Sequence, residues 1–177
     1  MDIKLLVMDV DGTLTDGKIY MSANGELMKA FNIKDGYAIA RLREYGIEPV
    51  VITGRSSDIV SHRCSELKIN ELYQGIENKS FKLREVCKNL NLNLSQVAYI
   101  GDDLNDWPCM KICGCSACPS DAIKQVKESV NYVCEAKGGD GAVREFIDFL
   151  ISNKYQEETL DFSFDEIKYE LDINFND

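Results

Sequence analysis

The sequence has no apolar run long enough to cross a membrane. Its longest uninterrupted apolar stretches, such as Leu5–Met8 and Val50–Ile52, are only a few residues long, whereas a membrane-spanning helix needs about 20. The first of these stretches comes almost directly after Met1 and is soon followed by Asp9 and Asp11, a pattern unlike that of a signal peptide. We therefore expect a cytoplasmic protein.

The sequence is also poor in patterns that bind zinc. It contains one histidine, His62, on a predicted helix, where we interpret it as solvent-exposed. The cysteines number seven, and without an export signal we expect free thiols. Four of them lie close together, at Cys109, Cys113, Cys115 and Cys118. This spacing lacks the two CxxC pairs of a typical zinc site, so we favour small buried side chains over a zinc or iron–sulfur site.

The chain has no excess of basic residues, and its formal net charge is −10. This charge argues against nucleic acid as a partner. From Tyr155 onward there are eight acids and one base, which leaves 22 acids and 19 bases in the rest of the chain. The acidity therefore belongs mainly to the C-terminal tail, and it does not argue against an anionic substrate bound in the body of the protein.

Short apolar runs alternate with amphipathic segments along the chain, which predicts an α/β fold with a Rossmann-like parallel sheet flanked by helices. We predict strands at Ile3–Val10, Pro49–Thr53, Leu72–Gln74, Val97–Ile100, Gly114–Cys118 and Tyr132–Cys134. We predict helices at about Gly36–Tyr45, Ser57–Leu67, Lys79–Leu90, Asp106–Cys113, Asp121–Val126 and Gly141–Ile151. These elements form one predicted domain, residues 1–153.

One segment breaks the alternation. Lys18–Ile33 reads as two strands around Asn24-Gly25, a strong hairpin signal because both residues tolerate positive φ angles. The hairpin directly follows the first strand, so we expect it to lie over the carboxyl end of that strand.

The acidic tail, residues 154–177, supports two interpretations. Alternating apolar residues from Ile167 to Phe175 are typical of an extended segment, although Ser163 and Glu166 together resemble a helix capping box. A disordered acidic tail is the other interpretation, and the sequence does not separate the two.

Asp9-Val-Asp11-Gly-Thr13 stands where the first apolar strand ends. Open α/β folds bind their ligands outside the carboxyl edge of the sheet. Two carboxylates at such a place are costly to bury unless a cation or hydrogen bonds compensate their charge. The pair therefore indicates a functional site more strongly than a surface turn or a helix cap.

The segment from Asp9 to Thr15, Asp-Val-Asp-Gly-Thr-Leu-Thr, resembles the first motif of the haloacid dehalogenase-like phosphatase superfamily. Three further motifs follow in the order of that superfamily: Thr53 at the end of an apolar strand, Lys79 after Gly-Ile-Glu-Asn, and Gly101-Asp102-Asp103-Leu104-Asn105-Asp106. A threonine or a lysine alone is weak evidence. Four motifs in order, each at a strand end or a helix start, are specific.

The resemblance implies a role for each of these residues. Asp9 would attack phosphorus and form an aspartyl-phosphate. Asp11 would protonate the leaving alcohol and later deprotonate the attacking water. Thr53 and Lys79 would hold the phosphoryl oxygens.

The resemblance also implies Mg²⁺ as the cofactor. Its ligands would be the carboxylates of Asp9 and Asp102 and the backbone carbonyl of Asp11. Asp103 and Asp106 would lie behind these ligands and orient the metal-bound water and the lysine.

Many members of the superfamily carry a cap domain, but residues 14–52 and 80–101 are too few to hold one. The capless phosphatases that this chain resembles form tetramers, in which the hairpin and a neighbouring subunit close the site. The resemblance therefore implies a homotetramer with a small-molecule substrate, and no nucleic acid or membrane partner.

Within the superfamily the chain is similar to the 3-deoxy-D-manno-octulosonate 8-phosphate phosphatases and their relatives in sialic-acid pathways, which act in sugar-acid and lipopolysaccharide biosynthesis. Matching segments include 31–37, 52–55, 63–64, 73–75 and 138–145, and the similarity extends to about Asn153. The implied substrate contacts are Asp11, Asn32, Ile33, Lys34, Asp35, Gly36, Arg55, Arg63 and Lys79. The forked donors of the two arginines suit a sugar-acid carboxylate.

The sequence departs from this family in several places. Ala40 stands where many members have an arginine, and Asp140 occupies a position that is often basic. A nonulosonate 9-phosphate, of KDN or N-acetylneuraminate, is therefore an alternative substrate. Arg55 favours the octulosonate, since nonulosonate phosphatases tend to have glutamate there. A catalytically silent interaction domain is the alternative from another class, but such a domain is expected to lose a catalytic carboxylate, and all are present here.

Overall fold

The computed structural model describes residues 2–158 and contains a six-stranded parallel sheet. Its strands are β1 (Leu5–Met8), β4 (Glu48–Ile52), β5 (Glu71–Tyr73), β6 (Val97–Ile100), β7 (Cys115–Cys118) and β8 (Tyr132–Val133). The strand order is β5-β4-β1-β6-β7-β8, and every neighbouring pair is parallel. The predicted fold class is confirmed.

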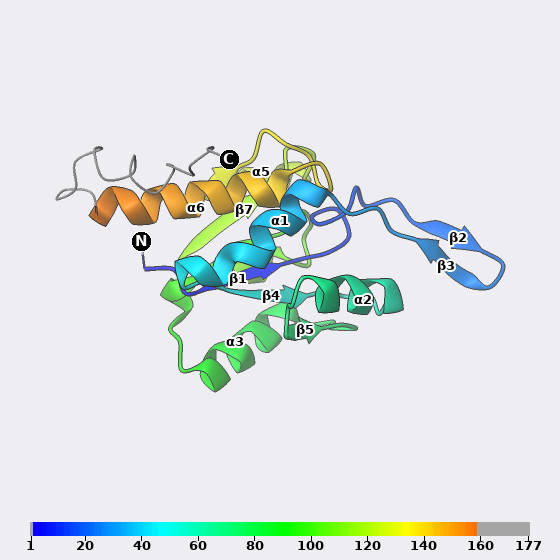
Figure 1. Cartoon of the computed structure of the whole chain (residues 1–177), viewed down its shortest axis with the longest axis horizontal. Coiled ribbons are helices and arrows are strands. Elements are labelled where there is room, and N and C mark those ends of the chain that lie inside the picture. The colour runs from blue at the N-terminus through cyan, green and yellow to red at the C-terminus, as the bar shows by residue number, and fades with distance from the viewer. Residues whose placement is uncertain (1, 159–177) are drawn as a thin grey trace, which may run out of the picture.

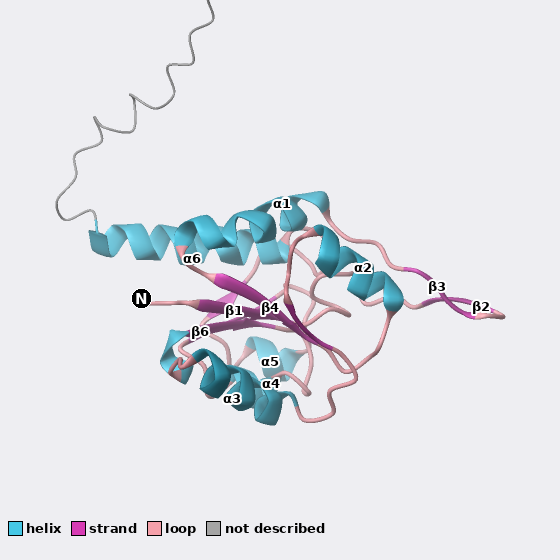
Figure 2. Ribbon diagram, turned by 60° about the horizontal axis from the view of Figure 1, so that its bottom comes forward, coloured by secondary structure: helices cyan, strands magenta, loops and turns pink. Residues whose placement is uncertain are grey.

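Helices cover both faces of the sheet (Figure 2). One face carries α1 (Ile33–Arg41), α2 (Asp58–Glu66) and α6 (Ala142–Glu158); the other carries α3 (Lys79–Leu90), α4 (Trp107–Met110) and α5 (Lys124–Lys127). Alternate side chains of β1 point to opposite faces. Leu6 and Met8 therefore pack into the core beneath α1 and α6, while Leu5 and Val7 pack into the core above α3. Burial on both faces explains why the central strands are continuous apolar runs.

Several element boundaries differ from the predicted ones. Helix α1 begins three residues early because the Asn32 side chain accepts a hydrogen bond from the Lys34 amide (2.8 Å) and caps the helix. Its last predicted residues form a separate 3₁₀ turn, η1 (Leu42–Tyr45), and a second 3₁₀ turn, η2 (Leu94–Gln96), precedes β6. Helices α4 and α5 are single turns. Helix α6 runs past its predicted end at Ile151, and past residue 153, to Glu158.

The hairpin is confirmed. Strands β2 (Tyr20–Ser22) and β3 (Gly25–Met28) pair antiparallel, and Gly25 adopts a φ of +113°. The hairpin extends away from the body of the molecule (Figure 1). Both interpretations of the acidic tail concern residues that lie almost entirely outside the described range.

The seven cysteines are free thiols, as predicted, and six of them are buried. Burial raises the pKa of Cys109 to about 12 and that of Cys115 to about 11, so these thiols stay protonated and behave as small apolar side chains. His62 is exposed, as predicted. Within residues 2–158, no helix is both long and apolar enough to cross a membrane.

Glu145, in the first turn of α6, ties the helix to the loop that follows β8. Its carboxylate accepts hydrogen bonds from the Tyr132 hydroxyl and from the amides of Glu135 and Ala136, each at 2.9 Å. Burial acts to raise the pKa of Glu145, but the two amides and the hydroxyl outweigh it, and the pKa lies below its usual value.

We predict that Glu145→Gln destabilises the protein by about 1 kcal/mol at pH 7. The NH₂ group of glutamine would replace a carboxylate oxygen that accepts hydrogen bonds from the backbone. The folded pKa is depressed, so this stabilisation is present above the unfolded value of about 4.5 and is lost as the pH falls through the folded value. Urea denaturation at pH 7 and at about pH 3 measures both effects. Glu135→Gln, at an exposed position, is the matched control; a loss in Glu145→Gln that persists at low pH would contradict the prediction.

Candidate active site

The four predicted motifs meet at the carboxyl edge of the sheet. Asp9 follows β1, Thr53 follows β4 and Asp102 follows β6, and these three strands are neighbours. Lys79 is the first residue of α3. A single edge of the sheet therefore gathers residues that are up to 93 positions apart, between 9 and 102, in the sequence.

A buried lysine lies at the centre of the site. The Lys79 ammonium is 2.8 Å from Asp9 Oδ1 and 2.7 Å from Asp106 Oδ1. All three side chains are almost fully buried. A buried charge is tolerated only when it is paired, so the lysine and the two carboxylates depend on one another.

Asp106 uses both of its carboxylate oxygens inside the protein. Oδ1 accepts from Lys79 and from the Tyr99 hydroxyl (2.8 Å), and Oδ2 accepts from the backbone amides of Asp102 (3.2 Å) and Asp103 (3.4 Å). With these partners Asp106 orients Lys79 and the loop after β6. Tyr99 was not predicted to belong to the site, because in the sequence it reads as one more apolar strand residue.

The carboxylates of Asp9, Asp102 and Asp106 come within 4.8 Å of one another, the one such group of potential metal ligands in residues 2–158. Because Asp106 is saturated with donors, Asp9 and Asp102 are the pair with capacity for a cation. Asp102 Oδ1 has one side-chain donor, Thr13 Oγ1 at 3.2 Å. Oxygen ligands at this spacing fit Mg²⁺.

The loop after β1 lies directly over Asp102. Gly12 adopts a φ of +92°, and a side chain at this position would overlap the Asp102 carboxylate. Only glycine both adopts this φ angle readily and leaves room for the Asp102 carboxylate. This close approach brings the backbone around Asp11 beside the two carboxylates, where its carbonyl would be the third protein ligand.

The electrostatics of the site favour binding of a cation. Burial, and next the charge of Asp106, raise the pKa of Asp9 to about 7, although Lys79 acts in the opposite direction. Burial and the same Asp106 charge raise the pKa of Asp102 to about 7. Lys79 keeps a raised pKa, since the two carboxylates outweigh its burial. One lysine does not balance three carboxylates, and a divalent cation would.

The carboxylate of Asp11 contacts the hairpin and the loop after β4. Its Oδ1 contacts the Lys29 ammonium, and its Oδ2 lies 3.7 Å from Arg55 Nε. Lys29 was not among the predicted site residues, because its position on the hairpin gives no sign of contact with the loop after β1. Thr53 is buried at the end of β4 beside Arg55, and its backbone is fixed by hydrogen bonds with Tyr73 (2.9 Å) and Ile76 (3.1 Å).

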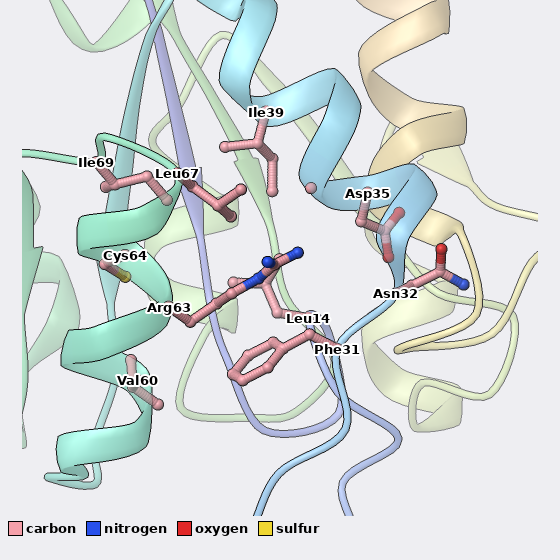
Figure 3. Close-up of a pocket in the computed structure, with 11 residues that line it drawn as sticks. Leu14, Phe31, Asn32, Asp35, Ile39, Val60, Arg63, Cys64, Leu67 and Ile69 are labelled. Atoms are coloured by element: carbon pink, nitrogen blue, oxygen red, sulfur yellow. The ribbon is translucent and has the colours of Figure 1, made fainter.

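Arg63 lies in a pocket between α1 and α2, with Asn32, Asp35 and Gly36 opposite (Figure 3). Its guanidinium packs 5.7 Å from the centre of the Phe31 ring and donates to Glu66 (2.7 Å), while its Nε has no hydrogen-bond partner. The predicted substrate contacts around residues 32–36 and Arg63 are thus brought together.

Within this group the side chains differ in accessibility. Ile33 and Lys34 are exposed. Asp35 is buried, and its Oδ1 accepts from the Arg144 amide at the start of α6 (2.7 Å) while Oδ2 is unpartnered. Burial raises the pKa of Asp35. In this structure its carboxylate links α1 to α6, and its role as a substrate contact stays a prediction.

Asp103 lies at the surface. Its Oδ1 accepts from the Leu104 amide of the same turn (2.7 Å). The side chain therefore stabilises the loop locally in this structure, and its predicted role behind the metal ligands stays a prediction.

Fold and site together define a haloacid dehalogenase-like hydrolase, and residues 65–147 match the family model with that description. The chain is 45% identical over 150 residues to the 3-deoxy-D-manno-octulosonate 8-phosphate phosphatase of Escherichia coli K12, covering 85% of this chain and 80% of that protein. The chain thus belongs to the 3-deoxy-D-manno-octulosonate 8-phosphate phosphatase family.

Solved structures agree with this membership. The phosphatase of that name from Yersinia pestis superposes with a TM-score of 0.83 at 43% identity, over 88% of this chain and 85% of that one. The enzyme from Moraxella catarrhalis, solved in complex with a magnesium ion, a phosphate ion and a KDO molecule, gives a TM-score of 0.83 at 36% identity, over 92% and 94%.

We predict that Mg²⁺ stabilises the protein more at pH 8 than at pH 5. Asp9 and Asp102 have folded pKa values of about 7, above the reference value of 3.8. Without metal, their contribution to stability is full below about pH 4 and is lost as the pH rises through 7. Mg²⁺ binds the charged carboxylates, so its binding strengthens over the same range.

Thermal melting with and without Mg²⁺ at the two pH values measures this effect. Asp102→Asn should greatly reduce the Mg²⁺-induced rise in Tm at pH 8, whereas Asp148→Asn, on the exposed part of α6, should keep it. An equal rise at both pH values would show that these carboxylates do not form the metal site.

Proposed function

We propose that this chain is a Mg²⁺-dependent phosphoric monoester hydrolase that cleaves 3-deoxy-D-manno-octulosonate 8-phosphate through an aspartyl-phosphate. The observation that carries the proposal is the buried set of Asp9, Lys79 and Asp106 beside Asp102. The family relationship supports the choice of substrate. The proposed place of action is sugar-acid biosynthesis in the cytoplasm.

The first chemical step transfers the phosphoryl group to the enzyme. An Asp9 oxygen forms a bond to phosphorus as the bond from phosphorus to the sugar oxygen breaks, and Asp11 gives its proton to the departing oxygen. Lys79, 2.8 Å from Asp9 Oδ1, is placed to neutralise the phosphoryl oxygens, and Thr53 would donate to them.

The second step releases phosphate. A water molecule loses a proton to Asp11 and attacks phosphorus, and the bond to Asp9 breaks. Bound Mg²⁺, held by Asp9, Asp102 and the Asp11 carbonyl, would offset the repulsion between the nucleophile and the anionic phosphate.

The sugar acid requires a second recognition region. Arg55, exposed beside Thr53, and Arg63, in the pocket with Asn32 and Gly36, offer guanidinium groups for its carboxylate. The side chain of Arg63 is 16% exposed, and its Nε is buried without a hydrogen-bond partner.

The relatives favour the octulosonate over the alternatives. The curated proteins that the chain matches at 44–45% identity are octulosonate phosphatases. A silent interaction domain would not need the intact, mutually paired carboxylates of this site.

We predict that Asp9→Asn abolishes hydrolysis while the protein stays folded, because an amide does not attack phosphorus. Asp11→Asn should lose about 10²- to 10⁴-fold in kcat, the usual value of general acid–base catalysis. Phosphate release is measured with Mg²⁺ on 3-deoxy-D-manno-octulosonate 8-phosphate, KDN 9-phosphate and N-acetylneuraminate 9-phosphate. A higher kcat/KM on either nonulosonate would overturn the proposed substrate, and turnover by Asp9→Asn would overturn the mechanism.

The proposed working unit is a homotetramer in which subunits complete one another's active sites. The site has no cap, and the hairpin exposes Ile19, Met21, Leu27 and Met28 to about half or more of their maximum. An apolar surface of this kind marks an interaction site, and closed symmetry would bury all four hairpins.

We predict that light scattering at micromolar concentration gives four times the chain mass of 20.0 kDa. Leu27→Glu, which places a charge on the hairpin, should dissociate the assembly and lower turnover. Leu90→Glu, at an exposed position near the end of α3, is the matched control and should stay tetrameric. A fully active protein at the mass of one chain would contradict the proposal.

A further inference from the structure

Lys29 is a buried cation on a hairpin that otherwise points into solvent. Only 2% of its side chain is exposed, whereas the side chain of Lys18, at the base of the same hairpin, is 70% exposed. The Lys29 ammonium contacts Asp11 Oδ1 and lies 3.1 Å from Glu26 Oε1. A lysine loses hydration when it is buried and needs such partners.

The contact belongs to a group of four charges that joins the hairpin to two loops of the active site. Glu26 Oε1 is 3.8 Å from Arg55, and Arg55 Nε is 3.7 Å from Asp11 Oδ2. Ser57, which caps α2, donates its hydroxyl to Glu26. The two carboxylates of this group balance its two cations, so removing one of the four leaves an uncompensated charge.

Asp11 itself stands on a loop beyond the end of β1, and 21% of its side chain is exposed. Within residues 2–158, its carboxylate has no hydrogen bond to a residue of the parallel sheet. The hydrogen bond of Lys29 to Oδ1 occupies one oxygen, and the Arg55 contact with Oδ2, at 3.7 Å, is too long for a hydrogen bond. Oδ2 is therefore the oxygen with capacity to carry a proton.

We propose that Lys29 is a positioning residue that orients Asp11, so that Oδ2 passes the proton to the leaving oxygen. This inference rests on the proposed phosphatase function. In the step concerned, the bond from phosphorus to the ester oxygen breaks, the bond from Asp9 to phosphorus forms, and the Asp11 proton moves to the departing oxygen. Lys29 exchanges no proton and touches neither phosphorus nor the leaving group.

If Lys29 orients Asp11, its loss should affect two kinds of phosphate ester unequally. A lysine that only holds the hairpin in place would affect both equally. A sugar alkoxide is a poor leaving group and needs the proton, whereas 4-nitrophenolate leaves readily without one. Loss of Asp11 orientation should therefore slow hydrolysis of the sugar-acid phosphate far more than hydrolysis of 4-nitrophenyl phosphate. Opening of the hairpin would slow both.

The experiment compares Lys29→Met, Lys29→Arg and Lys18→Met with the wild type on both esters in the presence of Mg²⁺. We expect Lys29→Met to lose about 10- to 100-fold in kcat on the sugar-acid phosphate, part of the full value of general acid catalysis, and less than about 3-fold on 4-nitrophenyl phosphate. Lys29→Arg, which keeps the cation, should recover most of the loss. Lys18→Met removes the same charge from the same hairpin and should match the wild type.

Leu27→Glu, the hairpin variant that should dissociate the assembly, separates orientation from closure, because it leaves the four paired charges unchanged. It should change both esters by the same factor. Circular dichroism melts confirm that each variant is folded.

Equal losses on the two esters in Lys29→Met, or no loss on either, would overturn the role of Lys29. Wild-type protein that cleaves 4-nitrophenyl phosphate but no sugar-acid phosphate would instead overturn the proposed substrate. The role of Lys29 would then be decided with a simple primary alkyl phosphate, glycerol 3-phosphate, in place of the sugar acid. Wild-type protein that cleaves no ester would overturn both proposals.

Discussion

The pairing of one buried lysine with two buried aspartates controls the arrangement of the active site. Lys79 is within 2.8 Å of both Asp9 and Asp106, and none of the three is stable in the interior alone. Because each of the three needs the others as partners, the start of α3 is held beside the end of β1 and beside the end of the loop after β6. It also leaves an excess of negative charge around Asp102, which is what makes the site suitable for a divalent cation. Catalytic geometry and local stability therefore rest on the same contacts.

Glycines allow the loops to approach closely enough for this arrangement. A side chain at Gly101 would overlap Asp106, and one at Gly138 would overlap the carbonyl of Gly12. The loop before α6 thus presses on the loop that carries Asp11, and the Gly139 amide donates to the Thr13 carbonyl (3.0 Å). The segment from Gly138 to Gly141, far from the catalytic residues in sequence, acts as a support for them.

The hairpin combines two properties that suit a protein without a cap. It exposes apolar side chains such as Met21 and Leu27, while its Glu26 and Lys29 pair with groups of the active site. The apolar side chains are suited to contact with another subunit, and the charged ones are suited to the chemistry. A single short element would then couple assembly to the orientation of Asp11.

The sequence by itself determined the sheet and the positions of the catalytic groups along it. Central strands buried on both faces appear as uninterrupted apolar runs, and Asp9, Thr53 and Asp102 each follow such a run, so their convergence at one edge follows from parallel strand topology. The boundaries of α1 and α6 were predicted less well. The start of α1 was predicted three residues late, although its N-cap Asn32 is a local signal, and the end of α6 was predicted seven residues early.

Only the tertiary structure decided which side chains support the site. Tyr99 reads as an apolar strand residue, yet its hydroxyl donates to Asp106. Lys29 reads as an exposed hairpin lysine, yet it is buried against Asp11. Asp35 reads as a residue near the substrate, yet it accepts from the Arg144 amide. Each of these partners comes from a different element, and local sequence patterns do not record the identity of a distant neighbour.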